Sequence, residues 1–174
     1  TASYIDDSNR EIGLYGIFDG MGGEALGEEA SLIAAETVFK AHKKAESGSS
    51  SDKTVLSAIK DANAAICKKI LESGEKRIGT TFAALKIEND TARVYNVGDS
   101  RVYRLRNGEL TQISVDDTTA QRLVNMGMIT KEKAKTHEDR HKLTQHLGIF
   151  PNEMVIEAHK SQELELKKGD KFLL

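Results

Sequence analysis

Ten residues decide the fold of this chain: Leu14-Tyr15-Gly16-Ile17-Phe18-Asp19-Gly20-Met21-Gly22-Gly23. An apolar run ends there on a carboxylate, and three glycines follow within four residues. Apolar side chains then recur at three- and four-residue spacing from residue 24 to about residue 46, which predicts an amphipathic helix. We therefore expect a strand, a tight turn that carries Asp19, and a helix, in that order.

Two phosphate-binding interpretations of this turn can be weighed first. Gly20, Gly22 and Ala25 match the dinucleotide-binding pattern G-x-G-x-x-G/A. That fold needs a parallel strand directly after the helix, and the sequence predicts a second helix instead. Gly22 and Gly27 have the spacing of a Walker A loop, but two glutamates follow where Lys and Ser or Thr should meet the phosphate. Both interpretations are therefore disfavoured.

A third interpretation makes Asp19 a metal ligand. Mg²⁺ and Mn²⁺ prefer carboxylate and carbonyl oxygens, and the bare backbone of Gly20 lets a carbonyl approach a cation. A second acidic turn, Val97-Gly98-Asp99-Ser100-Arg101, lies between two predicted strands. If these strands share a sandwich with residues 12–18, Asp19 and Asp99 project from the same end. The alternative is structural: an Asp19 cap with permissive glycines, and an ordinary Gly-Asp hairpin turn.

The remaining pattern predicts an α+β fold with largely antiparallel sheets, because the β-rich runs are too closely spaced for crossover helices. Asn107-Gly108 is typical of a type I′ hairpin turn. Helices are expected over residues 24–46, 52–74, 118–125 and 131–134, and strands over residues 2–5, 12–18, 80–87, 91–97, 101–106, 109–113, 154–158 and 170–174.

Composition excludes several classes of protein. The 174 residues suit one domain, and 25 basic against 27 acidic residues give a net charge of −2, which offers no electrostatic footprint for nucleic acid or an anionic membrane. No apolar run approaches the length of a membrane span, and nothing resembles a signal peptide. The single cysteine, Cys67, excludes a disulfide framework. We expect a monomeric, cytoplasmic domain without a nucleic-acid partner.

The segment His137-Glu138-Asp139-Arg140-His141 spells H-E-x-x-H, the zinc-peptidase motif. On a helix, His137 and His141 would share a face and could bind zinc. The neighbouring residues offer almost no apolar face for packing such a helix into a core, so a solvated loop is favoured. Thiol chemistry is also disfavoured, because Cys67 lies in a predicted helix and no arginine follows it at C-x₅-R spacing.

Three motifs occur here in the order found in the metal-dependent protein phosphatases of the 2C family: Phe18-Asp19-Gly20-Met21-Gly22-Gly23, Gly79-Thr80-Thr81 and Val97-Gly98-Asp99-Ser100-Arg101. Four further stretches resemble the bacterial branch of this family in particular: residues 107–113, 116–118, 128–130 and 169–174. The resemblance spans nearly the whole chain, and several ordered motifs make it more specific than any one of them.

This resemblance implies a four-layer α-β-β-α sandwich of two antiparallel sheets flanked by helices. It also implies hydrolysis of phosphoserine and phosphothreonine, in proteins phosphorylated by a serine/threonine kinase, by a water that two Mn²⁺ or Mg²⁺ ions activate. By position, Asp19 would bridge the two metals, Gly20 would donate its carbonyl, and Asp99 would serve a third, weaker metal. Residues 116–141 would form a mobile flap, and no side chain of the chain would act as the catalytic nucleophile.

The resemblance also implies missing parts. The family's phosphate-gripping arginine lies upstream of the position of Thr1, and further acidic ligands lie downstream of Leu174. We therefore expect residues 1–174 to be a single catalytic domain truncated at both ends, active in its parent protein and inactive alone. An inactive phosphatase-fold module that binds partners is the main alternative, and a zinc peptidase built on His137 and His141 is a weaker one.

Overall fold

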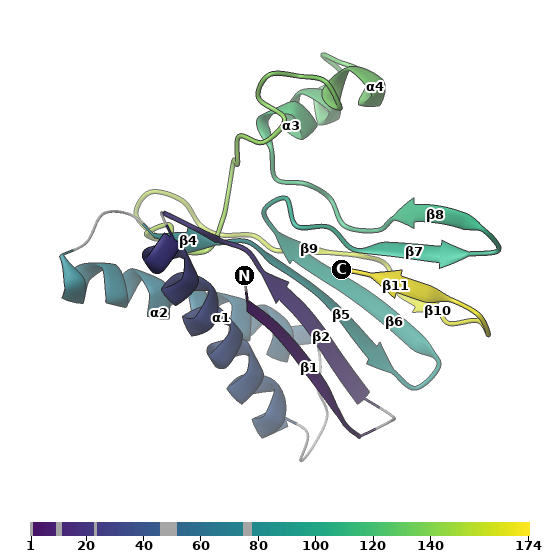
Figure 1. Ribbon diagram of the computed structural model, residues 1–174, viewed down its shortest axis with the longest axis horizontal. Coiled ribbons are helices and arrows are strands. Elements are labelled where there is room, and N and C mark those ends of the chain that lie inside the picture. Colours follow the sequence, from purple (N-terminus) through teal and green to yellow (C-terminus); the bar gives the residue numbers. More distant parts are fainter. Residues whose placement is uncertain (1, 10–11, 23, 46–51, 75–77) are drawn as a thin grey trace.

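The computed structural model describes residues 2–9, 12–22, 24–45, 52–74 and 78–174. Two long helices, α1 (Glu24–Ala45) and α2 (Asp52–Ser73), follow the decisive turn as predicted. The last predicted residue of the first helix, Glu46, lies outside the described residues. The buried face of α2 includes every apolar position that the spacing predicted, from Val55 to Ile70. Figure 1 shows both helices on one side of the main sheet.

The main sheet is antiparallel throughout, as the close spacing of its strands predicts. Its strand order is β1-β2-β5-β6-β10, and β9 also pairs with β6. Since α1 is followed by α2 and not by a parallel strand, the dinucleotide-binding interpretation has no support among the described residues. The strands are β1 (Ala2–Asn9), β2 (Ile12–Phe18), β5 (Phe82–Glu88), β6 (Thr91–Val97), β9 (His159–Lys160) and β10 (Leu164–Glu165).

A second sheet has the order β11-β7-β8, and a two-stranded pair joins β3 to β4. Asn107 and Gly108 connect β7 to β8 with φ values of 53° and 82°, so both turn residues are left-handed, as a type I′ turn requires. This hairpin is confirmed. The strands are β3 (Gly20–Met21), β4 (Gly79–Thr80), β7 (Tyr103–Arg106), β8 (Glu109–Gln112) and β11 (Lys171–Leu173).

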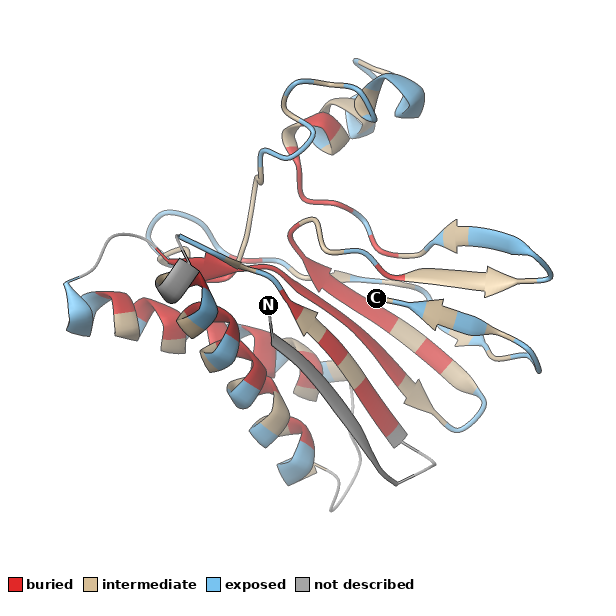
Figure 2. Cartoon of the chain, in the orientation of Figure 1, coloured by how far each residue is buried: buried red, intermediate tan, exposed pale blue. Residues whose placement is uncertain are grey.

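Alternation along the central strands creates two apolar cores, one on each face of the main sheet. The helix-facing core contains Phe18, Phe82 and Tyr95, which are almost completely buried. The Phe18 and Phe82 rings lie 5.3 Å apart between centroids, and burying a ring of this size contributes about 1.5–3 kcal/mol. Figure 2 shows the buried residues concentrated in the central strands and on the sheet-facing sides of the helices.

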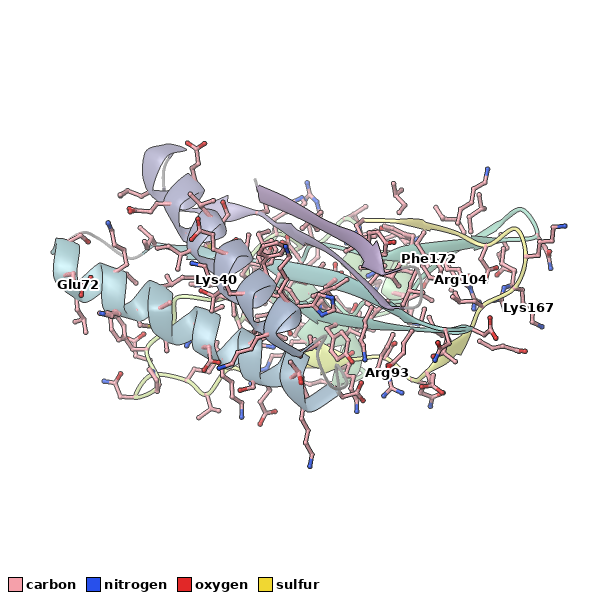
Figure 3. All side chains as sticks on the ribbon, turned by 90° about the horizontal axis from the view of Figure 1, so that it is seen from below. Lys40, Glu72, Arg93, Arg104, Lys167 and Phe172 are labelled. Atoms are coloured by element: carbon pink, nitrogen blue, oxygen red, sulfur yellow. The ribbon has the colours of Figure 1, made fainter. Side chains whose placement is uncertain are left out.

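The opposite core joins the two sheets. Leu85 and Val94 from the main sheet are buried together with Val102, and Phe172 packs against this cluster. Phe172 pairs with Arg104 across β11 and β7, and Figure 3 shows both side chains in this region. The α+β class with two antiparallel sheets is therefore confirmed, and the described residues supply the first helix pair and both sheets.

Two short helices, α3 (Thr119–Asn125) and α4 (Lys131–Ala134), form a segment that extends away from the sheets in Figure 1. We call residues 119–142 the α3–α4 segment. Thr118 caps α3 and Thr130 caps α4 through their hydroxyl oxygens. No helix in the described part of the chain is long and apolar enough to cross a bilayer.

Three strand predictions were wrong in position. Residues 154–158 form no strand, because the Gln145 side chain binds both backbone groups of Glu157 at 2.8 and 3.2 Å, and the paired segments are β9 and β10 instead. The predicted strand at residues 101–106 begins only at Tyr103. The one at residues 80–87 is divided, since Thr81 turns aside between β4 and β5 to bind Asp19.

Candidate metal centre

Asp19 directly follows the buried end of β2, and its side chain is exposed. Thr81 holds its backbone on both sides. The Asp19 N–H donates to the Thr81 hydroxyl at 3.1 Å, and the Thr81 N–H donates to the Asp19 carbonyl at 2.9 Å. A carboxylate is thus presented from a backbone that is anchored to the rigid sheet, as a metal or binding site requires.

Gly20 lies against the first turn of α1. A Cβ added at Gly20 would overlap the carbonyl of Gly27, and one added at Gly27 would lie 2.8 Å from the carbonyl carbon of Gly20. Only glycine fits at either position without a shift of the backbone. The close approach of this turn to α1 therefore explains Gly20 and Gly27, whereas Gly22 adopts a left-handed φ of 120°.

The Asp99 turn meets the same threonine. Gly98 has a φ of +96°, and a Cβ there would lie 2.8 Å from the Thr81 Cγ2. On the other side of Asp99, the Ser100 hydroxyl lies 2.6 Å from that of Thr81. The expected meeting of the two acidic turns at one end of the sandwich is therefore observed, although metal ligation by them stays a prediction.

The electrostatics around Asp99 favour a cation. Burial raises the pKa of the Asp99 carboxyl, and the neighbouring Asp116 carboxylate raises it further. Asp116 is itself buried and bound by Arg101, whose Nη2 lies 2.6 Å from Oδ2, and by the Gln112 amide at 2.9 Å. Since a divalent cation would compensate both the burial and the like charge, this environment suits a cation better than an isolated carboxylate.

The oxygen donors at the two acidic turns are of the kind that hard divalent cations bind. The carboxylates of Asp19 and Asp99 and the carbonyl of Gly20 are oxygen donors of the kind that Mg²⁺ and Mn²⁺ accept, and Gly20 sits in a cradle that a Cβ would fill. Within the described ranges, no three His, Cys, Asp or Glu side chains gather closely enough to hold a metal ion. These residues therefore fit part of a metal shell.

Two arginines on and just before β7 bind carboxylates from other parts of the chain. Arg101 is bound to Asp116, and this hydrogen bond raises the pKa of its guanidinium. The Arg106 Nε lies 2.7 Å from an oxygen of Asp170, a carboxylate that is nearly buried. Their partners lie 15 and 64 residues away in sequence, so local alternation could not identify them.

The zinc-peptidase and thiol alternatives lose support. Residues 137–141 form turns and not a helix, and the His137 Nδ1 accepts a hydrogen bond from the Asp139 N–H at 3.1 Å. Cys67 is buried on α2, where its Sγ donates to the Ile149 carbonyl at 3.4 Å. Burial raises the pKa of this thiol, which disfavours the nucleophilic thiolate.

Sequence reasoning missed two residues beside the site. No sequence motif includes His159, yet its Nε2 lies 2.7 Å from the Asp117 Oδ1. The other Asp117 oxygen, Oδ2, accepts the Gly98 N–H at 2.8 Å, directly next to Asp99. The tandem Asp116-Asp117 was the only available signal, because His159 and Asp117 are 42 residues apart.

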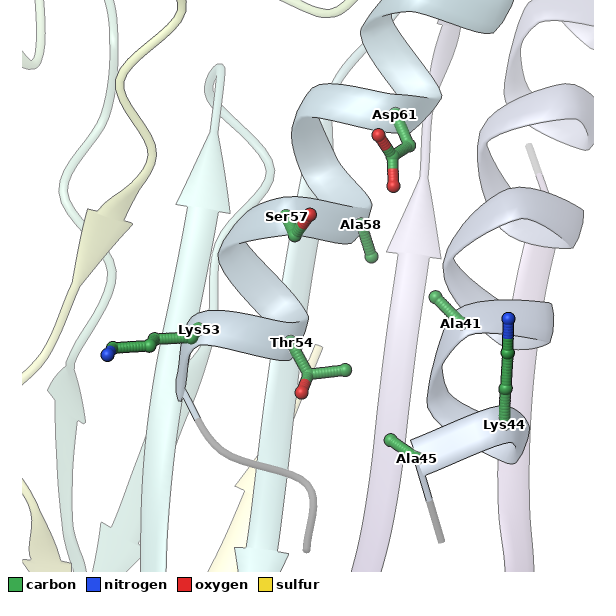
Figure 4. A pocket seen from close by; sticks show the side chains of 8 residues that line it. All are labelled: Ala41, Lys44, Ala45, Lys53, Thr54, Ser57, Ala58 and Asp61. Carbon is green, nitrogen blue, oxygen red and sulfur yellow. The ribbon is translucent and has the colours of Figure 1, made fainter. Parts of the chain in front are cut away.

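A separate hollow of about 410 Å³ opens between the end of α1 and the start of α2 (Figure 4). The 22 residues of α1 span roughly 33 Å, so this hollow lies at the opposite end of the helix from Gly20. It is therefore not part of the acidic site. Its lining consists of small and charged side chains: Ala41, Lys44, Ala45, Lys53, Thr54, Ser57, Ala58 and Asp61.

Comparison with known proteins gives one consistent result. The Protein phosphatase 2C family model matches residues 3–173. The serine/threonine protein phosphatase PstP of Mycobacterium tuberculosis is 35% identical over 162 residues, which cover 92% of this chain and 30% of PstP. The serine/threonine phosphatase stp of Listeria monocytogenes is 30% identical over 141 residues, which cover 76% of this chain and 54% of the relative.

Solved structures agree with the sequence relatives. The crystal structure of the M. tuberculosis serine/threonine phosphatase PstP/Ppp superposes with a TM-score of 0.80 at 31% identity, covering 98% of this chain and 75% of that one. The chain thus spans about a third to a half of the length of these two curated relatives.

Proposed function

Because the chain belongs to the protein phosphatase 2C family, we propose that it takes part in the metal-dependent hydrolysis of phosphoserine and phosphothreonine in proteins. The observation that carries this proposal is the meeting of the Asp19 and Asp99 turns at Thr81. Two carboxylates on rigid turns, with a glycine carbonyl beside one of them, are the oxygen donors that the family's metal-dependent chemistry needs.

Asp19 would hold two cations, Gly20 would contribute its carbonyl, and Asp99 would hold a third, weaker one. When bound, Mn²⁺ or Mg²⁺ would activate a water for in-line attack on phosphorus and neutralise charge on the phosphate. Thr81 keeps the Asp19 backbone in place, so the carboxylate needs little reorganisation. No nucleophilic side chain is required, which is consistent with the Ser100 hydroxyl being engaged by Thr81.

We propose that residues 116–141 form a flap, in which the buried residues 116–118 are the fixed base and the α3–α4 segment contacts the phosphoprotein. In support of this, the chain leaves the sheets beside the Asp99 turn and the α3–α4 segment extends away from them (Figure 1). Met126 and Met128 expose 56% and 68% of their surface there, and such flexible apolar side chains suit contact with varied peptides.

The proposed substrates are phosphoproteins made by a serine/threonine kinase, since the reaction removes the ester that such a kinase forms. A kinase of this kind draws on the cytoplasmic ATP pool, so we also propose a cytoplasmic location. We propose separately that the enzyme is monomeric. Cell fractionation and light scattering of the intact protein check these two points, and a membrane-bound or dimeric protein would contradict them.

The test uses the intact protein and a phosphoserine peptide, with Mn²⁺, Mg²⁺ and Zn²⁺ compared and EDTA as the metal-free reference. Hydrolysis is expected with Mn²⁺ or Mg²⁺ and not with EDTA. Asp19→Asn should lower kcat/KM by at least about a hundredfold, because it removes charge where cations are held. Asp61→Asn, which changes an exposed carboxylate on α2 (Figure 4), is the matched control and should keep the wild-type rate.

Two results would contradict the proposal. An unchanged rate in Asp19→Asn would remove Asp19 from the site. If none of the three metals supports hydrolysis, the result would favour the inactive partner-binding module instead.

A further inference from the structure

Asp117 occupies an unusual position between the Asp99 turn and the α3–α4 segment. The residue is 8% exposed, and its side chain and backbone make four hydrogen bonds to three different parts of the chain. A buried carboxylate is costly unless it is paired, and these contacts compensate the burial of Asp117.

Two of these bonds clamp Gly98. The Asp117 Oδ2 accepts the Gly98 N–H at 2.8 Å, and the Asp117 N–H donates to the Gly98 carbonyl at 3.0 Å. Both backbone groups of the residue before Asp99 are thus bound by one partner. Gly98 also has a left-handed φ and lies against Thr81, so the turn is enclosed on both sides.

The other two bonds reach away from this turn. The Asp117 carbonyl accepts the Thr144 N–H at 2.8 Å, which ties together the two ends of the chain that flank the α3–α4 segment. The Asp117 Oδ1 lies 2.7 Å from the His159 Nε2, on the strand β9 that pairs with β6. The carboxylate is therefore anchored to the main sheet and cannot swing with the segment.

We propose that Asp117 is a positioning residue for the metal centre: it holds the turn that carries Asp99 and fixes both ends of the α3–α4 segment to that turn. This inference rests on the proposed function, because it assumes that Asp99 receives a cation. Asp117 acts through Gly98 and touches neither the metal nor the substrate. Its loss should leave the Asp99 carboxylate present but poorly oriented.

Mn²⁺ binding to the intact protein, measured by calorimetry, gives a readout that does not depend on activity. Asp117→Ala should weaken the binding step that Asp99→Asn also weakens, by roughly tenfold or more, because buried hydrogen bonds to a charged group are lost. Asp117→Asn, whose amide oxygen can still accept the Gly98 N–H, should restore most of the affinity. The step that depends on Asp19 should be unchanged in both variants.

Asp170→Ala is the matched control. Like Asp117→Ala, it removes a nearly buried and paired carboxylate, but the partner of Asp170 is Arg106, and Asp170 directly precedes β11 and does not lie beside Gly98. It should lower thermal stability and leave Mn²⁺ binding unchanged. Equal weakening of Mn²⁺ binding by Asp170→Ala and Asp117→Ala would show a general effect of destabilisation and overturn the proposal.

Amide hydrogen exchange on the wild type covers the case in which Asp117→Ala does not fold. If Asp117 links the Asp99 turn to the segment ends, Mn²⁺ should slow exchange at both Gly98 and Thr144, since coupling between the sites is reciprocal. Mn²⁺ that protects Gly98 and leaves Thr144 unchanged would overturn the inference.

Mn²⁺ binding without peptide hydrolysis would refute the proposed function alone, and wild-type Mn²⁺ binding in Asp117→Ala would refute this inference alone.

Discussion

The hydroxyls of Thr81 and Ser100 lie 2.6 Å apart, and this contact connects the two acidic turns of the chain. Thr81 also accepts the Asp19 N–H, so one uncharged side chain holds both turns. It stands at the start of β5, where the chain turns aside from the sheet ladder. The relative placement of Asp19 and Asp99 therefore depends on a residue that carries no charge.

Thr81→Val keeps the shape of this side chain and removes its hydroxyl. We expect a loss of about 1–2 kcal/mol in the free energy of unfolding, because a partly buried N–H loses its acceptor. The kcat/KM of the intact protein should fall by more than the loss of folding stability explains, since both acidic turns lose their contact with residue 81. Thr91→Val, which removes a hydroxyl bond to the Glu88 carbonyl in a distant turn, is the control for chemical denaturation and kinetics.

Gly27→Ala is expected to destabilise the protein although it places alanine in a helix. In a free helix this substitution stabilises by about 1 kcal/mol. Here the added Cβ would lie 2.8 Å from the carbonyl carbon of Gly20 and 2.9 Å from its oxygen. We expect a net loss of roughly 1–3 kcal/mol and weaker Mn²⁺ binding. Increased stability with unchanged Mn²⁺ binding would show that the approach of Gly20 to α1 is unimportant.

Stability should depend on pH through His159. The hydrogen bond to Asp117 raises the pKa of this imidazole above its usual value of about 6.5, against the opposing effect of burial. A raised folded-state pKa means that the stabilisation is complete below the unfolded-state pKa. It is lost as the pH rises through the folded-state pKa. The denaturation midpoint of the wild type should therefore fall as the pH rises from the unfolded-state pKa of His159 to its higher folded-state pKa.

His159→Gln should remove that component of the pH profile. Lys160→Gln changes the neighbouring residue of β9 and its contact with Asp52, and it should keep the wild-type slope because the His159–Asp117 hydrogen bond is untouched. A slope that survives in His159→Gln would assign the effect to another group.

Tyr95→Phe separates stability from function. The Tyr95 side chain is completely buried, and its hydroxyl donates to the Asp52 Oδ1 at 2.6 Å at the start of α2. Arg93 also binds Asp52, so the carboxylate stays paired in the variant. We expect a loss of about 1–2 kcal/mol and an unchanged kcat/KM. If kcat/KM falls strongly although the variant is fully folded, the contacts of Asp52 with Tyr95 and Arg93 influence the metal site.

Much of the fold could be predicted because its elements are local. The strand at residues 91–97 and the helix at residues 131–134 were predicted to the residue, and the Asn107-Gly108 hairpin followed from turn chemistry alone. The two-residue strands β9 and β10 could not be predicted, since so short a segment has no periodicity. Their partners on β6 define them as strands.

The residues of the site also differ in whether the sequence alone could single them out. Asp19 and Asp99 could be singled out because each follows a predicted strand and lies beside glycine. Asp117 and His159 could not, because their contact spans 42 residues. Only the folded chain shows that Arg101 and Arg106 bind carboxylates, because these partners lie 15 and 64 residues away in sequence.

The sequence by itself determined the order of the long elements, the family and the two acidic turns, because periodicity, turn residues and ordered motifs each depend on residues that lie close together in the chain. Tertiary structure alone decided how these turns are oriented. The Asp19 turn is held by a threonine 62 residues away, and the Asp99 turn by a carboxylate 19 residues away. Such pairings depend on how the sheets and helices pack, and no local pattern encodes them.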